Sequence, residues 1–177
     1  MPILPNLTDV RAPTKWISNL LATRRSRCSL SKLVHIDILT KFDYIKFTYD
    51  YDLLDTTLSY VSKFYGRQIK LDLRFMHGWF SAHAELGKKN SVLGRLRCVS
   101  ALEISFSLHV DFTEVPIGLF LAWFSLFPSV KRVRLVGMLP HLERLVCQNQ
   151  EFLKSLAEMC PEMESFNGTD LGEYRIL

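Results

Sequence analysis

The sequence predicts an α/β solenoid, with parallel strands lining one face and helices covering the other. Three observations predict it: a short apolar motif recurs about every 30 residues, each copy ends in alternating apolar residues, and helical patterns lie between the copies. A repeat period in this range is typical of stacked supersecondary units, because one unit cannot bury its apolar side alone.

The motif places apolar residues three apart and then alternates them with polar ones. Copies occupy 4–10, 30–38, 96–104 and 127–135, with a partial copy at 160–166 and a weaker member at 69–73. The copies start near 4, 30, 66, 96, 127 and 160, so the intervals vary from 26 to 36 residues. Each alternating end predicts a short strand, which gives about five to six irregular repeats.

Helical patterns fill the intervals. We expect Thr14, Asp52 and Asn149 to cap helices, and Pro116 to lie in the first turn of an apolar helix that ends at Phe127. One side of each expected helix is apolar or faces the core. These positions are Trp16, Ile17, Leu20 and Leu21 after Thr14; Leu54, Leu58, Val61 and Tyr65 after Asp52; Phe152, Leu153, Leu156 and Cys160 after Asn149; and Trp79, Phe80, His83 and Leu86 in a less regular segment. Strands alternating with helices predict parallel pairing through helical crossovers.

The alternative architecture is a compact open α/β sheet. A doubly wound nucleotide-binding sheet needs a glycine-rich turn after a strand. The eight glycines are scattered, and neither GxGxxG nor GxxxxGK[ST] occurs. We therefore favour the solenoid and expect residues 1–177 to form a single repeat domain that is part of a longer array.

Composition narrows the environment of the protein. The chain is 48% hydrophobic, with a net charge of +4 that is too small by itself to indicate nucleic acid. Four cysteines without a CxxC pair and a start without a signal-peptide pattern predict an intracellular protein, cytoplasmic or nuclear. The apolar run 115–127 is too short to span a membrane, so no membrane partner is expected.

Two segments carry a family resemblance. Residues 127–135 resemble the FPxLxxLxL lines of leucine-rich-repeat proteins. Residues 149–166 are similar to the FLxxLAxxCPxLExL lines of F-box/leucine-rich-repeat proteins, especially of the divergent fungal type. The resemblance implies a leucine-rich-repeat-like fold whose repeats present a substrate-binding surface, whereas F-box helices dock a ubiquitin-ligase adaptor. The function it implies is the substrate-recognition part of an F-box-type ubiquitin ligase.

No F-box is evident in the chain itself. Leu4-Pro5 is superficially similar to an F-box start, but 6–11 continues as a repeat strand. Adaptor binding is therefore expected only if an F-box lies outside this chain, as in a truncated gene product or the C-terminal half of a longer protein. Because solenoid ends need polar caps, we also predict an exposed apolar end near Ile3, Leu7 and Trp16.

The best candidate for a partner surface is the outward side of the strands. Side chains alternate across a strand, so the polar residues between the inward apolar ones share one face. The predicted protein-binding residues are His35, Asp37, Lys70, Asp72, Arg74, Glu103, Ser105, Arg132 and Arg134. We placed Lys131 on the same face. Mixed charges favour a protein partner over a polyanion, which needs a track of one sign.

The competing hypothesis is an α/β domain that binds nucleic acid through Arg24–Arg27 and Lys131–Arg134. The run at Arg24 is equally explained as cations at a helix C-terminus. The basic pI favours this second hypothesis, and the mixed charges of the strand face weigh against it.

No residue pattern indicates a catalytic or metal site, so we expect no enzyme activity and no cofactor. The aspartates at 50, 52 and 55 fit a helix cap better than a calcium loop. His77, His83 and Cys98 lack a fourth zinc ligand. A hydrolase using His109 and Asp111 lacks a nucleophile elbow. The remaining nucleophile candidates are Cys147 and Cys160, and Cys160 occupies an apolar position of the repeat.

Overall fold

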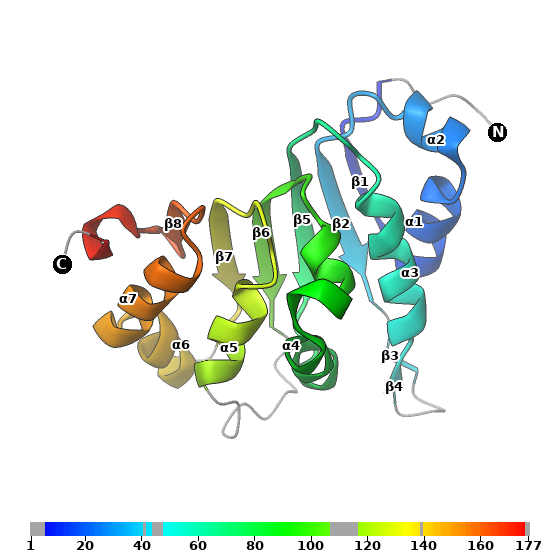
Figure 1. Cartoon of the computed structure of the whole chain (residues 1–177). Coiled ribbons are helices and arrows are strands. Elements are labelled where there is room, and N and C mark those ends of the chain that lie inside the picture. The colour runs from blue at the N-terminus through cyan, green and yellow to red at the C-terminus, as the bar shows by residue number, and fades with distance from the viewer. Residues whose placement is uncertain (1–5, 41, 44–47, 107–116, 139, 176–177) are drawn as a thin grey trace.

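The computed structural model contains a seven-stranded, mostly parallel sheet whose strands follow one another in chain order (Figure 1). It describes residues 6–40, 42–43, 48–106, 117–138 and 140–175. The strands of this sheet are β1 (Asp9–Pro13), β2 (His35–Leu39), β5 (Ile69–Arg74), β6 (Val99–Ser105), β7 (Arg132–Val136), β8 (Ser165–Phe166) and β9 (Thr169–Asp170). Strands β1 to β8 pair in parallel and β9 is antiparallel to β8, so the sheet has two edges and is not closed.

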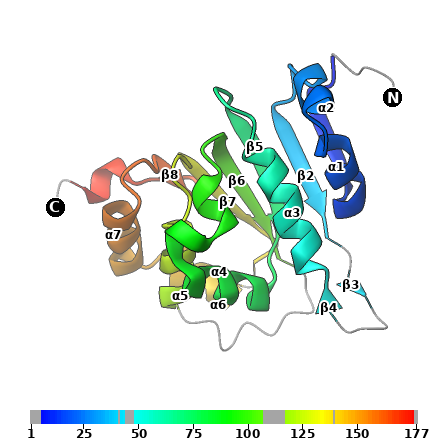
Figure 2. The same cartoon turned by 45° about the vertical axis from the view of Figure 1, so that its right-hand side comes forward.

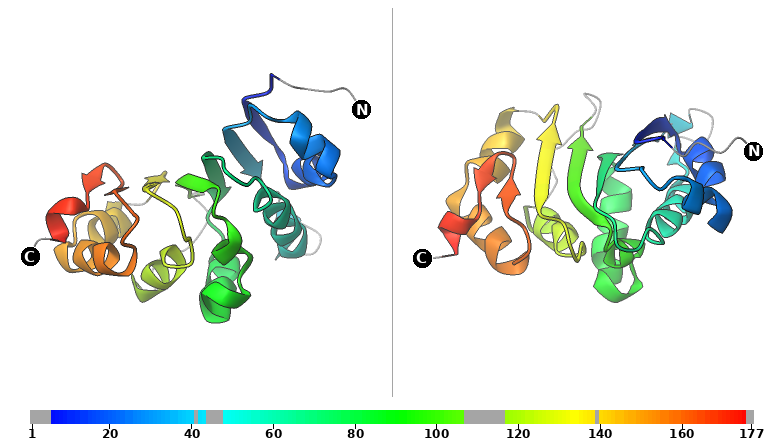
Figure 3. Two further views of the ribbon diagram at one scale, coloured as in Figure 1. Left: turned by 45° about the horizontal axis from the view of Figure 1, so that its top comes forward. Right: turned by 90° about the horizontal axis from the view of Figure 1, so that it is seen from above.

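Helices connect the parallel strands. They are α1 (Thr14–Leu21), α2 (Arg24–Ser29), α3 (Tyr51–Val61), α4 (His77–Asn90), α5 (Ile117–Phe124), α6 (Pro140–Cys147) and α7 (Gln150–Met159), with 3-10 turns η1 (Val92–Arg95) and η2 (Gly172–Tyr174). Helices α1, α3, α4, α5 and α7 form a row along the same face of the sheet (Figures 2 and 3). A separate short hairpin pairs β3 (Phe42–Asp43) with β4 (Thr48–Tyr49).

The register of the sheet follows the sequence motif. Val10 lies opposite Ile36, Ile36 opposite Leu71, and Leu71 opposite Leu102. The series continues through Val133 to Phe166. These residues occupy equivalent positions of the motif copies, so residues equivalent in sequence are neighbours in the sheet. All from Ile36 onward are buried, and the predicted α/β class with parallel strands is confirmed.

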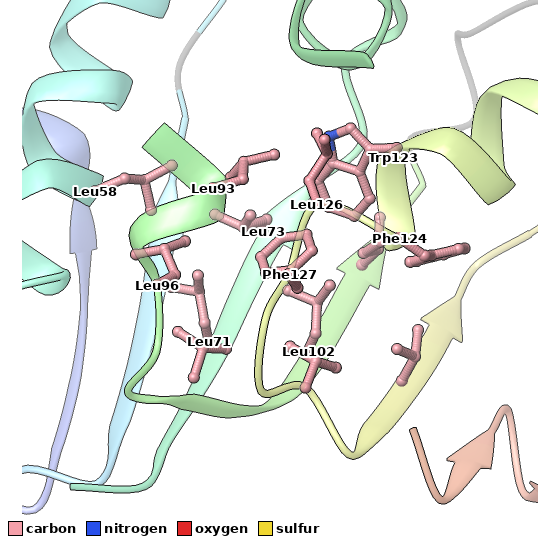
Figure 4. Packing of buried hydrophobic residues seen from close by; sticks show 14 of the residues in the cluster. Leu58, Leu71, Leu73, Leu93, Leu96, Leu102, Trp123, Phe124, Leu126 and Phe127 are labelled. Carbon is pink, nitrogen blue, oxygen red and sulfur yellow. The ribbon is translucent and has the colours of Figure 1, made fainter. Parts of the chain in front are cut away.

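Buried leucines and aromatic residues, among them Trp123, Phe124 and Phe127, fill the space between the central strands and their helices (Figure 4). The rings of Phe80 on α4 and Trp123 on α5 stack with centroids 3.9 Å apart and an interplanar angle of 14°. Phe75, which follows β5, stacks on Phe120 of α5 at 5.7 Å. Buried rings of this size contribute both apolar area and favourable ring geometry. The cluster therefore ties α4 and α5 to the middle of the sheet.

Two of the predicted helix caps are wrong. Asp50, not Asp52, caps α3, because its side chain accepts a hydrogen bond from the Leu53 N–H at 2.9 Å. Asp52 instead places a carboxylate in the first turn. Thr14 is already the first residue of α1, and the residue before it, Pro13, has no side-chain oxygen to act as a cap. Asn149 caps α7 as predicted, by accepting from the Phe152 N–H.

Other elements differ from the predictions at their ends. Helix α3 ends at Val61, so Tyr65 is not on its buried side and is 84% exposed. Gly66, with φ +71°, turns the chain toward β5 in a conformation that side chains disfavour. The hairpin β3–β4 and helix α6 were not predicted. Pro116 lies outside the described residues.

The predicted apolar end is present in part. Trp16 on α1 is 71% exposed, whereas Leu7 is half-buried against the core, and Ile3 lies outside the described residues. Among the described residues, no helix combines the length and apolar character needed to cross a membrane.

The two tryptophans Trp123 and Trp16 provide a matched test of the core. We expect Trp123→Ala to lower the free energy of unfolding by about 3–5 kcal/mol, because it empties a fully buried site between α4 and α5. Trp16→Ala should change it by no more than about 0.5 kcal/mol, because that ring is mostly in water. Urea denaturation measures both, and equal losses would contradict the packing.

Candidate protein-binding surface

The nine polar residues predicted to face outward all lie in β2, β5, β6 and β7, where they alternate with buried apolar residues. The register brings them into rows across the sheet. One row joins Asp37, Asp72, Glu103 and Arg134 on successive strands. We call the nine residues, together with Asp9 and Arg11 of β1, the outward strip.

Asp9 and Arg11 were missed because the motif copy at 4–10 was read without its alternating extension. Asp9 and Arg11 flank Val10 at alternate positions, which is the signal that could have found them. Arg11 Nε lies 3.0 Å from Asp37 Oδ2, and Asp9 Oδ1 lies 3.1 Å from His35 Nδ1.

Lys131 does not belong to the strip, contrary to the prediction. Adjacent residues of a strand point to opposite faces, so Lys131 and Arg132 cannot both face outward from one strand. Lys131 precedes β7, and its ammonium lies 2.7 Å from Glu164. That hydrogen bond lowers the pKa of Glu164.

A chain of charged side chains crosses four adjacent strands of the sheet, β2, β5, β6 and β7. Asp72 Oδ2 lies 2.8 Å from His35 Nε2 and 3.2 Å from Lys70 Nζ. Lys70 continues the chain to Glu103 Oε2 at 3.0 Å, and Arg134 lies 3.9 Å beyond. The half-buried members hold one another in position, as connected polar networks do.

The carboxylates of Asp37, Asp72 and Glu103 lie close together and offer more hydrogen-bond acceptors than the network fills. Burial raises the pKa of Asp37, with Arg11 opposing the shift and the charges of Asp72 and Glu103 adding to it. Asp72 Oδ1 is buried and has no hydrogen-bond partner within the described part of the chain. An unpaired buried acceptor costs free energy.

The part of the strip from β1 to β6 lines a depression of about 360 Å3. Asp9, Asp37, Asp72 and Glu103 line it together with Arg11, His35 and Arg74. The side chains of Arg74 and Arg132 have no hydrogen-bond or ion-pair partner among the described residues, and Arg132 is exposed to solvent. The strip is thus richer in carboxylates toward β1 and richer in free guanidinium groups toward β7.

A second polar cluster lies between α3, α4 and η1. Asp55 Oδ1 accepts from Trp79 Nε1 at 2.8 Å and lies 3.0 Å from His83 Nε2. His83 Nδ1 is 2.8 Å from Ser91 Oγ, which also accepts from the Leu93 N–H. The residue types are those of a hydrolase triad, but Ser91 has no exposed surface. The cluster joins α3, α4 and η1, so the contacts of His83 are structural.

The other catalytic candidates are not gathered into a site. Burial raises the pKa of the Cys160 thiol to about 11, and Cys160 packs in the core as predicted. Cys147 is half-buried, and burial raises its pKa too. His109 and Asp111 lie outside the described residues. Within the described ranges, no three His, Cys, Asp or Glu side chains come together as metal ligands.

The basic run at 24–27 was predicted to end a helix. It instead starts α2, after the Thr23 cap. Arg27 nevertheless donates to the Leu21 and Ala22 carbonyls at the end of α1, so it binds a helix C-terminus. This run precedes β2 and Lys131 precedes β7, three strand spacings or about 14 Å apart at the least. The two basic groups of the nucleic-acid hypothesis therefore do not form one patch.

Comparison of the chain with protein-family models, with curated proteins and with solved structures gives no significant match.

The pKa of Asp37 tests the coupling within the strip. A raised folded-state pKa means that this carboxyl contributes stability below the ordinary aspartate pKa, and the contribution is lost as pH rises through the raised value. Carboxyl-carbon NMR should show Asp37 titrating above an ordinary aspartate. In Asp72→Asn its pKa should fall, because a neighbouring negative charge is gone.

Glu151→Gln is the matched control, since it removes an exposed carboxylate on α7. It should leave the titration of Asp37 unchanged. If Asp37 titrates identically in the wild type and in Asp72→Asn, the strip is not electrostatically coupled as described.

Proposed function

We propose that the chain is a non-catalytic, leucine-rich-repeat-like scaffold that binds a protein partner through the outward strip. The observation that carries the proposal is the strip itself: polar side chains from five adjacent strands lie in register, and the helices form a row on the opposite face. A row of side chains on a rigid sheet presents fixed contacts to a partner.

The solenoid part of the proposal rests on repetition. Equivalent motif residues occupy equivalent sheet positions from Val10 to Phe166, and the strand order never reverses. In a doubly wound sheet the order would reverse, and a ligand would bind at the reversal point. A repeat stack instead offers the whole strand face, which suits an extended protein surface.

Charge pattern supports a protein as the partner. The strip combines the carboxylates of Asp37, Asp72 and Glu103 with the guanidinium groups of Arg132 and Arg134. A protein surface can place a cation over the acidic end and an anion over the basic end, which favours one orientation of binding. A polyanion would meet repulsion at the acidic end.

The family resemblance extends the proposal to an intracellular ubiquitin ligase. There the strip would recognise the substrate, and an adaptor would bind only through an F-box outside this chain. Co-purification of a ubiquitin-ligase adaptor with the longest natural form of the protein would support this role. If no adaptor co-purifies, the ubiquitin-ligase role is wrong and the proposal is reduced to a protein-binding scaffold.

Charge reversal on β7 tests the binding face. Arg132→Glu with Arg134→Glu should abolish specific capture of partners from cell lysate, because both side chains are exposed on the strip. Quantitative mass spectrometry of the captured proteins measures the effect.

The control is Lys15→Glu with Lys154→Glu, which makes the same change in net charge on exposed positions of α1 and α7. It should retain the partners, and thermal melting should show both variants folded. If the β7 variant still captures every specific partner, the outward strip is not the binding face.

A further inference from the structure

A basic pocket lies where α2 meets the connection from α3 to β5. Its volume is about 430 Å3, and the cations that line it are Arg24, Arg27, Lys63 and Arg67. Phe64 and Tyr65 complete the pocket on the side of the connection. The two basic segments are almost 40 residues apart in sequence, so only the fold brings them together.

No carboxylate from the described residues lines this pocket. The outward strip, in contrast, pairs most of its charges internally. The pocket is therefore a place where positive charge gathers without a neighbouring carboxylate in its lining.

Two of the cations are held by backbone carbonyls. Arg67 Nη1 donates to the Leu30 carbonyl at 2.6 Å, and its guanidinium lies 5.0 Å from the centre of the Phe64 ring. Arg27 Nη1 donates to the Leu21 carbonyl at 2.5 Å. A guanidinium has five N–H donors, so each keeps donors for a ligand while its position is fixed.

The other two cations are free to bind. Arg24 and Lys63 are exposed, and the side chain of neither makes a hydrogen bond or ion pair with any described residue. The Lys63 ammonium lies over the Tyr60 ring, 5.2 Å from its centre. Four cations around one cavity repel each other, and an anion bound between them would remove that repulsion.

We propose that this pocket binds the phosphate group of a phosphorylated side chain on a protein partner. A phosphate monoester carries close to two negative charges and three strong acceptor oxygens, which match several converging cations. The site lies apart from the outward strip, so the proposal stands or falls separately from the proposed function.

The compact shape favours phosphate on a side chain over a nucleic-acid backbone. A nucleic acid is bound along a track of single-sign charge that extends over several nucleotides. Here the other basic group precedes β7, two strands along the sheet from β5, and its Lys131 is already paired with Glu164.

NMR titration of the full chain tests the proposal. The probes are inorganic phosphate, a phosphoserine peptide with glycine and serine flanks, the same peptide without phosphate, and a short oligouridylate. We expect saturable amide shifts in 24–28 and 63–67 with phosphate and with the phosphopeptide, and none with the unmodified peptide. Bound phosphate should also slow alkylation of the exposed Cys28, which lines the pocket.

Two double variants localise the effect. Arg24→Glu with Lys63→Glu should weaken phosphopeptide binding at least tenfold, because it removes two charge-assisted contacts that no internal partner needs. Arg25→Glu with Lys15→Glu makes the same charge change at exposed positions that do not line the pocket, and it should preserve binding.

Three results would overturn the proposal. The first is the absence of saturable shifts with both phosphate and the phosphopeptide. The second is an equal loss of binding in the two double variants, which would show only non-specific attraction. The third is tighter binding of oligouridylate than of the phosphopeptide with the same dependence on Arg24 and Lys63, which would make the pocket a nucleic-acid site. The pull-down through Arg132 and Arg134 is unaffected by any of these results.

Discussion

The parallel register of the inward apolar residues is the constraint on which the structure depends. Each of the strands β2, β5, β6 and β7 contributes only two or three buried side chains, too few to stabilise a unit of its own. Placing Ile36 beside Leu71, and Leu71 beside Leu102, joins them into one core under the helices. A slip of one residue would turn these side chains to the outward face and expose the apolar row to water.

The outward strip is a consequence of the same register. Once the apolar residues are fixed inside, the intervening polar residues are placed in rows about 5 Å apart across neighbouring strands. His35, Asp72, Lys70 and Glu103 come close enough to pair only for this reason. The charges that we propose for partner binding are therefore positioned by the core rather than by flexible loops.

Much of the sheet was predictable because the motif repeats locally. The alternation in 30–38, 69–73, 96–104 and 127–135 indicates both the strands and their buried sides, and nine members of the strip followed from it. Features that depend on contacts between distant segments were not predictable. The basic pocket needs residues 24–28 beside 63–67, and the His83 cluster needs Asp55 beside Ser91. Helix ends were also missed, because the choice between Asp50 and Asp52 as a cap depends on backbone geometry.

Interstrand backbone NOEs test the in-order register most directly. The structure predicts NOEs that link β2 to β5 around Ile36 and Leu71, and β6 to β7 around Leu102 and Val133. Such contacts would support a sheet built repeat by repeat. NOEs that link β2 directly to β6 or β7, or a register displaced by one residue, would contradict the account.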